Sequence, residues 1–310
     1  MISKQPAGLY APKSILIALV ASSVYLLFSF FLIGFKTDQL VLAAIFNACF
    51  FLSTASRKFI IGFSIFIVYW ILFDYMKAFP NYTFNTVHIQ DLYNAEKSLF
   101  GIPYQGKIIT PNEYWLLNGN AGLTLMSGFF YLCWIPVPLG FAAWLFFRDK
   151  AIFLHFSLTF VLVNFIGFVI YYAYPAAPPW YYQLNGARFI AATKGNTAGL
   201  KNFDAWFNIS VFRSLYEKSS NVFAAMPSLH SSYPLIVFYF SVKKKLGWVN
   251  AIFIAITLGI WFAAVYTSHH YILDVLAGIA CAIIGIFIFE KILLQSNSFN
   301  KFLNRYKANI

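Results

Sequence analysis

The sequence predicts an all-α fold, a polytopic bundle of transmembrane helices, and three observations support this prediction. Of the 310 residues, 60% are hydrophobic and only 10% are charged, whereas about a quarter of the residues in a soluble domain are charged. Several uninterrupted apolar runs are each long enough to cross a hydrocarbon core of about 30 Å. The basic residues behind the net charge of +12 are spread over loops, which is typical of membrane topology and not of a nucleic-acid-binding surface.

Eight spans can be placed in order along the chain, each to within a few residues. The first is too long for the apolar core of a signal peptide and lacks a small-residue cleavage pattern, so it is interpreted as a retained anchor. The second and the sixth are short, which indicates a tilted or re-entrant segment or a different boundary. The spans lie at about 15–35, 39–54, 58–76, 122–146, 151–174, 227–242, 247–267 and 270–290.

The basic residues also predict how the bundle is oriented. The 22 lysines and arginines divide 13 to 9 between its two faces. The larger group lies in short segments that include both ends of the chain, whereas most of the smaller group lies in two long loops, which count little for orientation. The first face is therefore predicted to be cytoplasmic, with both termini inside, in a bacterial inner membrane or, in a eukaryote, in the Golgi membrane.

Two long segments, about 77–121 and 175–226, are predicted on the outer face. The first contains TVHIQDLYNAEKSLFG, in which Leu92, Ala95 and Leu99 share a helical face and Gly101 offers a stop. This pattern predicts an amphipathic helix lying at the membrane interface. The second begins with YPAAPPWYYQ, where prolines end the fifth span and aromatic rings suit the headgroup level.

Ionisable residues interrupt the apolar sequence in VYTSHHYILDVLAG, between the seventh and eighth spans. His270 and Asp274 are four residues apart, so on a helix they share a face and can hydrogen-bond. A carboxylate on one imidazole nitrogen fixes the tautomer and leaves the other nitrogen free as a nucleophile or base. His269 points elsewhere in this arrangement. A carboxylate within the membrane costs several kcal/mol and usually has a partner or a function.

A second polar cluster, NVFAAMPSLHSSYPL, enters the membrane from the same side. Pro227 and Ser228 suit a helix start, and His230 then falls in the first turn. Two helix N-termini thus carry His230 and His270, and helix N-termini attract phosphate. The pair is predicted to act on one phosphate as nucleophile and acid. No cofactor or metal is expected, because only His230 and His269 could add to a His–Asp pair as zinc ligands.

At these residues the sequence resembles a known family. PSLHSS and HHYILD resemble the second and third motifs of the type 2 phosphatidic acid phosphatase superfamily, and with PPWY they are closest to its inositol phosphorylceramide synthase branch. The resemblance covers about residues 165–290. It implies a six-helix phosphatase-type core with additional N-terminal spans. The chain then divides into N-terminal spans with an outer interfacial segment (1–121), this core (122–293) and a basic cytoplasmic tail (294–310).

The resemblance also implies roles for individual residues. His270 matches the nucleophile that becomes phosphorylated, and Asp274 matches the residue that orients it. His230 matches the acid that protonates the leaving alcohol, and Ser228 matches a serine that contacts the phosphate.

The departures from the superfamily pattern concern the cations that bind phosphate. The lysine and arginine of the first motif are missing from YYAYPAAPPWYY, and Ala263 and Ala264 stand where the third motif usually begins Ser-Arg. The synthase branch shares these losses, which favours it over an ordinary phosphatase. Charge on the phosphodiester must still be neutralised, and Arg188 and Arg213 in the outer loop are the candidates.

The resemblance implies a membrane phosphotransferase that moves inositol phosphate from phosphatidylinositol to a ceramide-type acceptor through a phosphohistidine. Its expected partners are these lipids and the membrane, not nucleic acid. A lipid phosphatase, acting on phosphatidate or a polyprenyl diphosphate, would use the same residues with water as the acceptor. A third possibility is a transporter or lipid-binding protein whose histidines gate a path.

Overall fold

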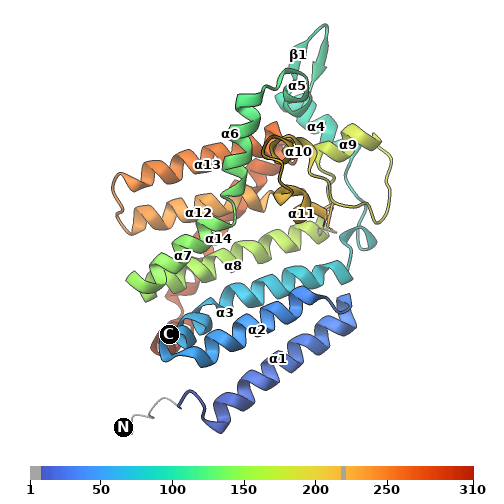
Figure 1. Ribbon diagram of the computed structural model, residues 1–310. Coiled ribbons are helices and arrows are strands. Elements are labelled where there is room, and N and C mark those ends of the chain that lie inside the picture. The colour runs from blue at the N-terminus through green and yellow to red at the C-terminus, as the bar shows by residue number, and fades with distance from the viewer. Residues whose placement is uncertain (1–7, 218–220) are drawn as a thin grey trace.

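Long helices run side by side through the body of the molecule, and a cap of short elements covers one end of them (Figure 1). The computed structural model describes residues 8–217 and 221–310. The helices are α1 (Pro12–Ile33), α2 (Thr37–Leu52), α3 (Thr54–Tyr75), α4 (Gln90–Phe100), α5 (Pro111–Asn118), α6 (Ala121–Leu132), α7 (Pro136–Arg148), α8 (Lys150–Ala173), α9 (Pro179–Asn185), α10 (Lys201–Phe207), α11 (Val211–Glu217), α12 (Leu229–Lys243), α13 (Val249–Tyr266), α14 (Ile272–Lys291) and α15 (Asn297–Asn309); β1 (Ile102–Tyr104) and β2 (Lys107–Ile109) form a hairpin.

Membrane-spanning helices account for most of the bundle. In the described part of the chain, six helical segments are long and apolar enough to cross a bilayer. The outer surface of α1 is typical of them, since Leu16, Phe28 and Phe31 are exposed where a soluble protein would place polar side chains. The protein is therefore a multi-pass membrane protein, and the all-α prediction is confirmed. The two shortest predicted spans correspond to α2, with 16 residues, and α12, with 15.

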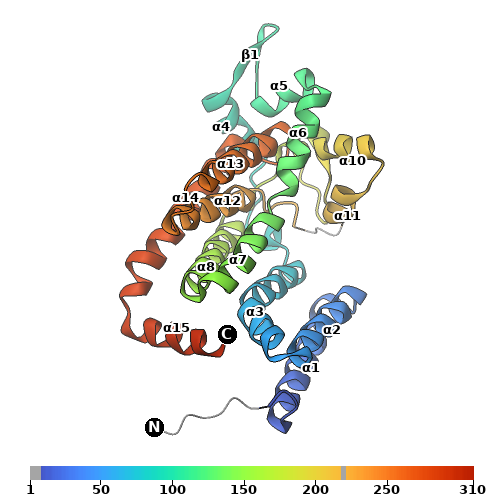
Figure 2. The same ribbon diagram turned by 60° about the vertical axis from the view of Figure 1, so that its left-hand side comes forward.

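The fourth predicted span is divided, which the hydropathy pattern did not indicate. α6 ends at Leu132, and α7 begins at Pro136 after a short turn. Proline lacks the N–H that a continuous helix would need, and it favours the first position of a new one. α6 therefore leans on α13 while α7 lies along α8, as the two views show (Figures 1 and 2).

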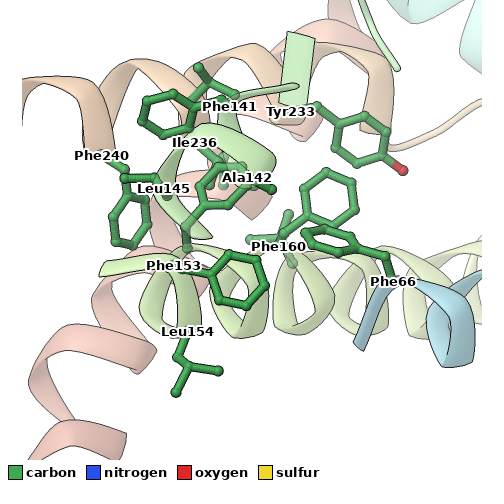
Figure 3. Close-up of a cluster of buried hydrophobic side chains, with 14 of the residues drawn as sticks. Phe66, Phe141, Ala142, Leu145, Phe153, Leu154, Phe160, Tyr233, Ile236 and Phe240 are labelled. Carbon is green, nitrogen blue, oxygen red and sulfur yellow. The ribbon is translucent and has the colours of Figure 1, made fainter. Parts of the chain in front are cut away.

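The main hydrophobic core lies where α3, α7, α8, α12 and α14 meet. Phe66 of α3 packs edge-on against Phe160 of α8, which in turn lies against Tyr233 of α12. Phe141 and Leu145 of α7 fill the next layer (Figure 3). The predicted tail is also ordered, because α15 packs against α8 and the Tyr306 hydroxyl donates to the Ile61 carbonyl at 2.6 Å. This packing fixes α8, α12 and α14 relative to one another.

The cap is built from the two predicted outer segments, which bond to each other. His88 pairs with Ala176, and Ala176 pairs with Ala224, as parallel β-bridges. The side chain of Asn81, which is buried, donates to the Tyr171 and Phe223 carbonyls at 2.8 Å each. The chain just before α12 is thereby held from both sides.

The predicted amphipathic helix exists as α4, but its buried face differs from the prediction. Leu92 is buried as expected, whereas Leu99 is 66% exposed. The second buried position is Glu96, an acidic residue that the pattern of apolar residues did not place on the buried face. α4 packs against α14 and α9, so it belongs to the cap of the bundle.

Candidate active site

His230 and His270 meet at the end of the bundle that the cap covers. His230 lies in the first turn of α12, as predicted, and His270 lies in the turn between α13 and α14. Nδ1 of His230 is 3.0 Å from Nε2 of His270. The two imidazoles thus face each other from the start of α12 and from the turn before α14, which is the arrangement needed to act on one atom from two sides.

Asp274 lies on the other side of His270. Its Oδ2 is 3.5 Å from Nδ1 of His270 and accepts a hydrogen bond from the Tyr271 amide at 2.9 Å. Oδ1 of Asp274 and Nδ1 of His270 are buried without a hydrogen-bond partner in the described structure. His270 precedes the helix, so the expected i,i+4 pair on one helix is wrong in detail. The carboxylate still faces the nitrogen that points away from His230.

Direct backbone contact brings α12 and α14 together at the site. The Ser228 amide donates to the Asp274 carbonyl at 2.9 Å, and the Ser232 hydroxyl donates to the Gly278 carbonyl at 2.7 Å. A Cβ at Gly278 would lie 2.1 Å from the Ser228 carbonyl oxygen, far inside any allowed contact. Only glycine therefore permits this approach, which sets the spacing of His230 and His270.

The predicted helix start at Pro227 and Ser228 is shifted. α12 begins at Leu229, and the Ser228 side chain makes no capping bond. Its hydroxyl instead accepts a hydrogen bond from Ser231 at 3.0 Å. Ser228 is fully buried, so it ties the start of α12 to α14.

Aromatic rings pack against His230 and His269. Trp134 meets His230 edge-on, with ring centroids 4.4 Å apart, and Tyr131 is 5.4 Å from the same ring. His269 points away from Asp274, as predicted, and stacks on Tyr216 at 4.5 Å. These contacts place aromatic surface against His230 and His269.

Comparison with known proteins identifies the family. The model described as the PAP2 superfamily matches residues 107–288, a range that contains both histidines and Asp274. The chain belongs to the PAP2 superfamily. It is 41% identical to the phosphoinositol dihydroceramide synthase of Bacteroides thetaiotaomicron over 296 residues, which are 95% of this chain and 97% of the relative.

More distant relatives share only part of the chain. Over 148 residues, 47% of this chain and 34% of the relative, it is 31% identical to the inositol phosphorylceramide synthase catalytic subunit aur1 of Schizosaccharomyces pombe. Over 187 residues, 55% and 38% of the two chains, it is 28% identical to the inositol phosphorylceramide synthase of Candida albicans. No solved structure matches the chain. The resemblance predicted from PSLHSS and HHYILD is confirmed.

Two buried polar residues of the outer segment hold this PAP2-superfamily site in place, and no motif in the sequence marks either of them as a site residue. The Asn112 amide donates to the Val265 and His270 carbonyls at 2.8 and 2.9 Å, bridging the two ends of the histidine turn. The Glu96 carboxylate accepts from the Ile272 and Leu273 amides at 3.0 and 3.1 Å. Glu96 therefore caps α14, while Asn112 fixes the backbone of the nucleophile candidate.

One of these residues left a signal in the sequence. Thr110, Pro111 and Glu113 form a capping box, which predicts a helix start and so places Asn112 on an ordered element. The signal for Glu96 is weaker: it is an acidic residue one helical turn after Leu92, on an otherwise apolar face. Neither pattern indicates a bond to a residue more than 150 positions away.

In place of the Ser-Arg pair that usually begins the third motif, this chain has two buried alanines. Ala263 and Ala264 are both fully buried, and the Ala264 carbonyl accepts from the amides of His269 and His270 at 3.1 and 3.0 Å. Both alanines lie in a cluster with Tyr131 and Phe212. Close packing therefore occupies the place where this family usually has an arginine.

The two arginines proposed as phosphate ligands lie on the cap. Arg188 is exposed, and its carbonyl accepts from the Tyr181 hydroxyl at 2.8 Å. Arg213 is exposed and pairs with Glu217 at 2.7 Å. Among the described contacts, neither guanidinium touches His230 or His270. Nor do the described residues contain a group of three or more His, Cys, Asp or Glu side chains placed to hold a metal.

Glu96 gives a prediction about pH. Burial, reinforced by the nearby Asp274 carboxylate, raises the pKa of Glu96 from 4.5 to about 7. The folded protein therefore keeps a proton on Glu96 that the unfolded chain loses above its ordinary pKa, so the free energy of unfolding falls as pH rises from about 4.5 to 7.

We expect the melting temperature to drop by a few degrees across this pH window. Glu96→Gln keeps one accepting oxygen but does not titrate, and its thermal melting in detergent should lack this component. An unchanged pH profile in the variant would contradict the assignment.

Proposed function

We propose that this protein transfers inositol phosphate from phosphatidylinositol to a ceramide-type acceptor. The proposal rests on one observation above all: Nε2 of His270 and Nδ1 of His230 face each other at 3.0 Å, with Asp274 behind His270. The similarity to the phosphoinositol dihydroceramide synthase of Bacteroides thetaiotaomicron, which extends over 95% of this chain, supports the choice of substrates.

In the first half of the reaction, a phosphodiester separates the two imidazoles. Nε2 of His270 attacks phosphorus, and the bond from phosphorus to the diacylglycerol oxygen breaks. His230 donates its proton to that oxygen, so diacylglycerol leaves as the neutral alcohol. Nδ1 of His270 keeps its hydrogen, and the Asp274 carboxylate stabilises the positive charge that develops on the ring.

In the second half, the acceptor hydroxyl takes the place of diacylglycerol. His230, now neutral, accepts the hydroxyl proton, the new oxygen–phosphorus bond forms and the bond to His270 breaks. Transfer competes with hydrolysis only if water stays away from the phosphohistidine. Tyr131 and Trp134, which pack around His230, would provide this protection, and for this reason we favour transfer over a phosphatase reaction.

The test is product analysis with labelled phosphatidylinositol and purified protein, with and without ceramide. We expect labelled inositol phosphorylceramide only when ceramide is present, and none from His270→Ala. Free inositol phosphate at the same rate with or without ceramide would instead support the phosphatase. Products that persist in His270→Ala would refute the mechanism.

We also propose that the cap and the histidine site face outward and that both termini are cytoplasmic. The short basic segments support this orientation, because positive residues accumulate on the cytoplasmic side. A cysteine introduced for Lys107 in the β-hairpin should react with a membrane-impermeant maleimide in intact cells. One introduced for Lys307 in α15 should react only after lysis, and the reverse pattern would invert the topology.

A further inference from the structure

A cavity of about 400 Å³ opens on the cap beside the histidine turn. It is lined by residues between Gly195 and Glu217, a stretch that includes α10 and α11. Its volume is at the lower end of the roughly 300–1,000 Å³ of small-molecule sites. The cavity can hold a headgroup but not the acyl chains of a lipid.

The wall of this cavity carries two cationic and two acidic side chains, and they differ in how free they are to bind a ligand. Asp204 accepts hydrogen bonds from the amides of Phe212 and Arg213 at 3.2 and 2.9 Å, so its carboxylate is already used by backbone. Glu217 is paired with Arg213. Lys201 also lines the cavity, and it makes no ion pair with any described residue. Both carboxylates thus already accept hydrogen bonds from other residues, while the Lys201 ammonium has no ionic partner among the described residues. Lys201 is therefore available to a phosphate oxygen of a ligand.

The rest of the wall offers hydrogen bonds. Asn196, Thr197 and Ser210 contribute amide and hydroxyl groups, and Glu217 has a second carboxylate oxygen. A simple phosphate needs only donors, whereas a polyol needs donors and acceptors side by side. The combination suits a ligand that carries both several hydroxyls and a negative charge.

The floor of the cavity packs against the turn that carries the histidines. Tyr216 lines the cavity and stacks on His269, with centroids 4.5 Å apart, while its hydroxyl bonds to that of Tyr131 at 3.3 Å. Nε2 of His269 is 3.1 Å from the Thr197 carbonyl oxygen. A ligand on this floor therefore lies one ring away from the turn that carries His270.

We propose that this cavity binds the polyol headgroup of the anionic donor lipid. This inference rests on the proposed function and adds the headgroup site to it. Lys201 attracts the phosphodiester of the lipid, and the amide, hydroxyl and carboxylate groups bind the ring hydroxyls. The phosphodiester then faces the histidine turn, and the acyl chains extend into the membrane.

The test compares Lys201→Gln with Lys194→Gln, which changes an exposed lysine of the same outer segment that does not line the cavity. We expect KM for phosphatidylinositol to rise about tenfold in Lys201→Gln, as for loss of one charged hydrogen bond. Its kcat and its KM for ceramide should stay near wild type, and Lys194→Gln should match wild type throughout. Equal KM values in the two variants would overturn the site.

Soluble headgroups give a second measurement that does not depend on the variants' folding. Glycerophosphoinositol should inhibit the wild-type protein competitively with phosphatidylinositol, and about tenfold more weakly in Lys201→Gln. Glycerophosphocholine should not inhibit. Equal inhibition by both compounds would refute recognition of a polyol. A protein that transfers inositol phosphate normally while failing these tests would leave the proposed function intact and remove only this cavity from it.

Discussion

Replacing His230 with asparagine should lower the turnover of phosphatidylinositol by about 10²–10⁴-fold, the usual contribution of a general acid. Nδ1 of His230 is the atom that faces His270, and an asparagine amide occupies nearly the same position without being able to transfer a proton. The variant therefore keeps the contact with His270 but cannot protonate the leaving oxygen. Initial rates with labelled phosphatidylinositol and ceramide measure the loss.

The leaving group separates the acid role from a structural role. A donor in which inositol phosphate is esterified to nitrophenol needs no proton on departure, so His230→Asn should release one equivalent of nitrophenolate in a rapid burst. The labelled phosphoryl group should then stay on the protein, because the same residue is the base of the second step. His270→Ala should show no burst with either donor. A His230→Asn protein as inactive on the nitrophenyl donor as on the lipid would disprove the acid assignment.

The proximity of His230, His270 and Asp274 could be predicted because these residues lie in two short motifs. Charged and polar residues are so rare in the membrane spans that Asp274 and His270 stand out, and helix periodicity then limits how they can face. The spacing could not show that His270 sits in a turn before α14, since a shift of two residues in a helix start leaves hydropathy unchanged. The prediction that His230 and His270 meet is confirmed by the 3.0 Å distance between their ring nitrogens.

The supports of the site could not be predicted in the same way. Asn112 and Glu96 hold the turn after α13 and the start of α14 through bonds to backbone atoms. A backbone amide or carbonyl has no residue identity, so no pairing pattern in the sequence reveals which side chain will reach it. The outer segment, predicted as an interfacial helix apart from the core, is therefore part of the site's framework.

Cation placement was the other point beyond sequence reasoning. The sequence favours Arg188 and Arg213 because they lie between the motifs, but both are exposed on the cap. A loop of about fifty residues, such as 175–226, can place a side chain anywhere over the end of a bundle. Only the folded arrangement shows Lys201 and Arg213 on one cavity wall.

Gly278→Ala is expected to have the second large effect, because it acts on the contact that joins the two motif helices. The added Cβ would lie 2.1 Å from the Ser228 carbonyl oxygen, and both atoms are fixed to backbone, so the helices must move apart. Ser228 is two residues before His230, and a shift of about 1 Å in catalytic groups can cost about 10²-fold in rate. Overpacking of this kind also lowers stability by about 1–3 kcal/mol. Activity assays and thermal melting in detergent measure the two effects.

Two other glycines separate loss of activity from loss of stability. A Cβ at Gly285, on the same helix, would meet the Val163 side chain at 2.4 Å, so Gly285→Ala should lower the melting temperature while the folded fraction keeps its activity. Gly140 in α7 has nothing within 4 Å of an added Cβ, and Gly140→Ala should leave both properties near wild type. If Gly278→Ala retains wild-type turnover per folded molecule, the spacing of α12 and α14 does not control the histidine pair. If it loses turnover far beyond Gly285→Ala at similar stability, the Gly278–Ser228 contact sets the geometry on which transfer depends.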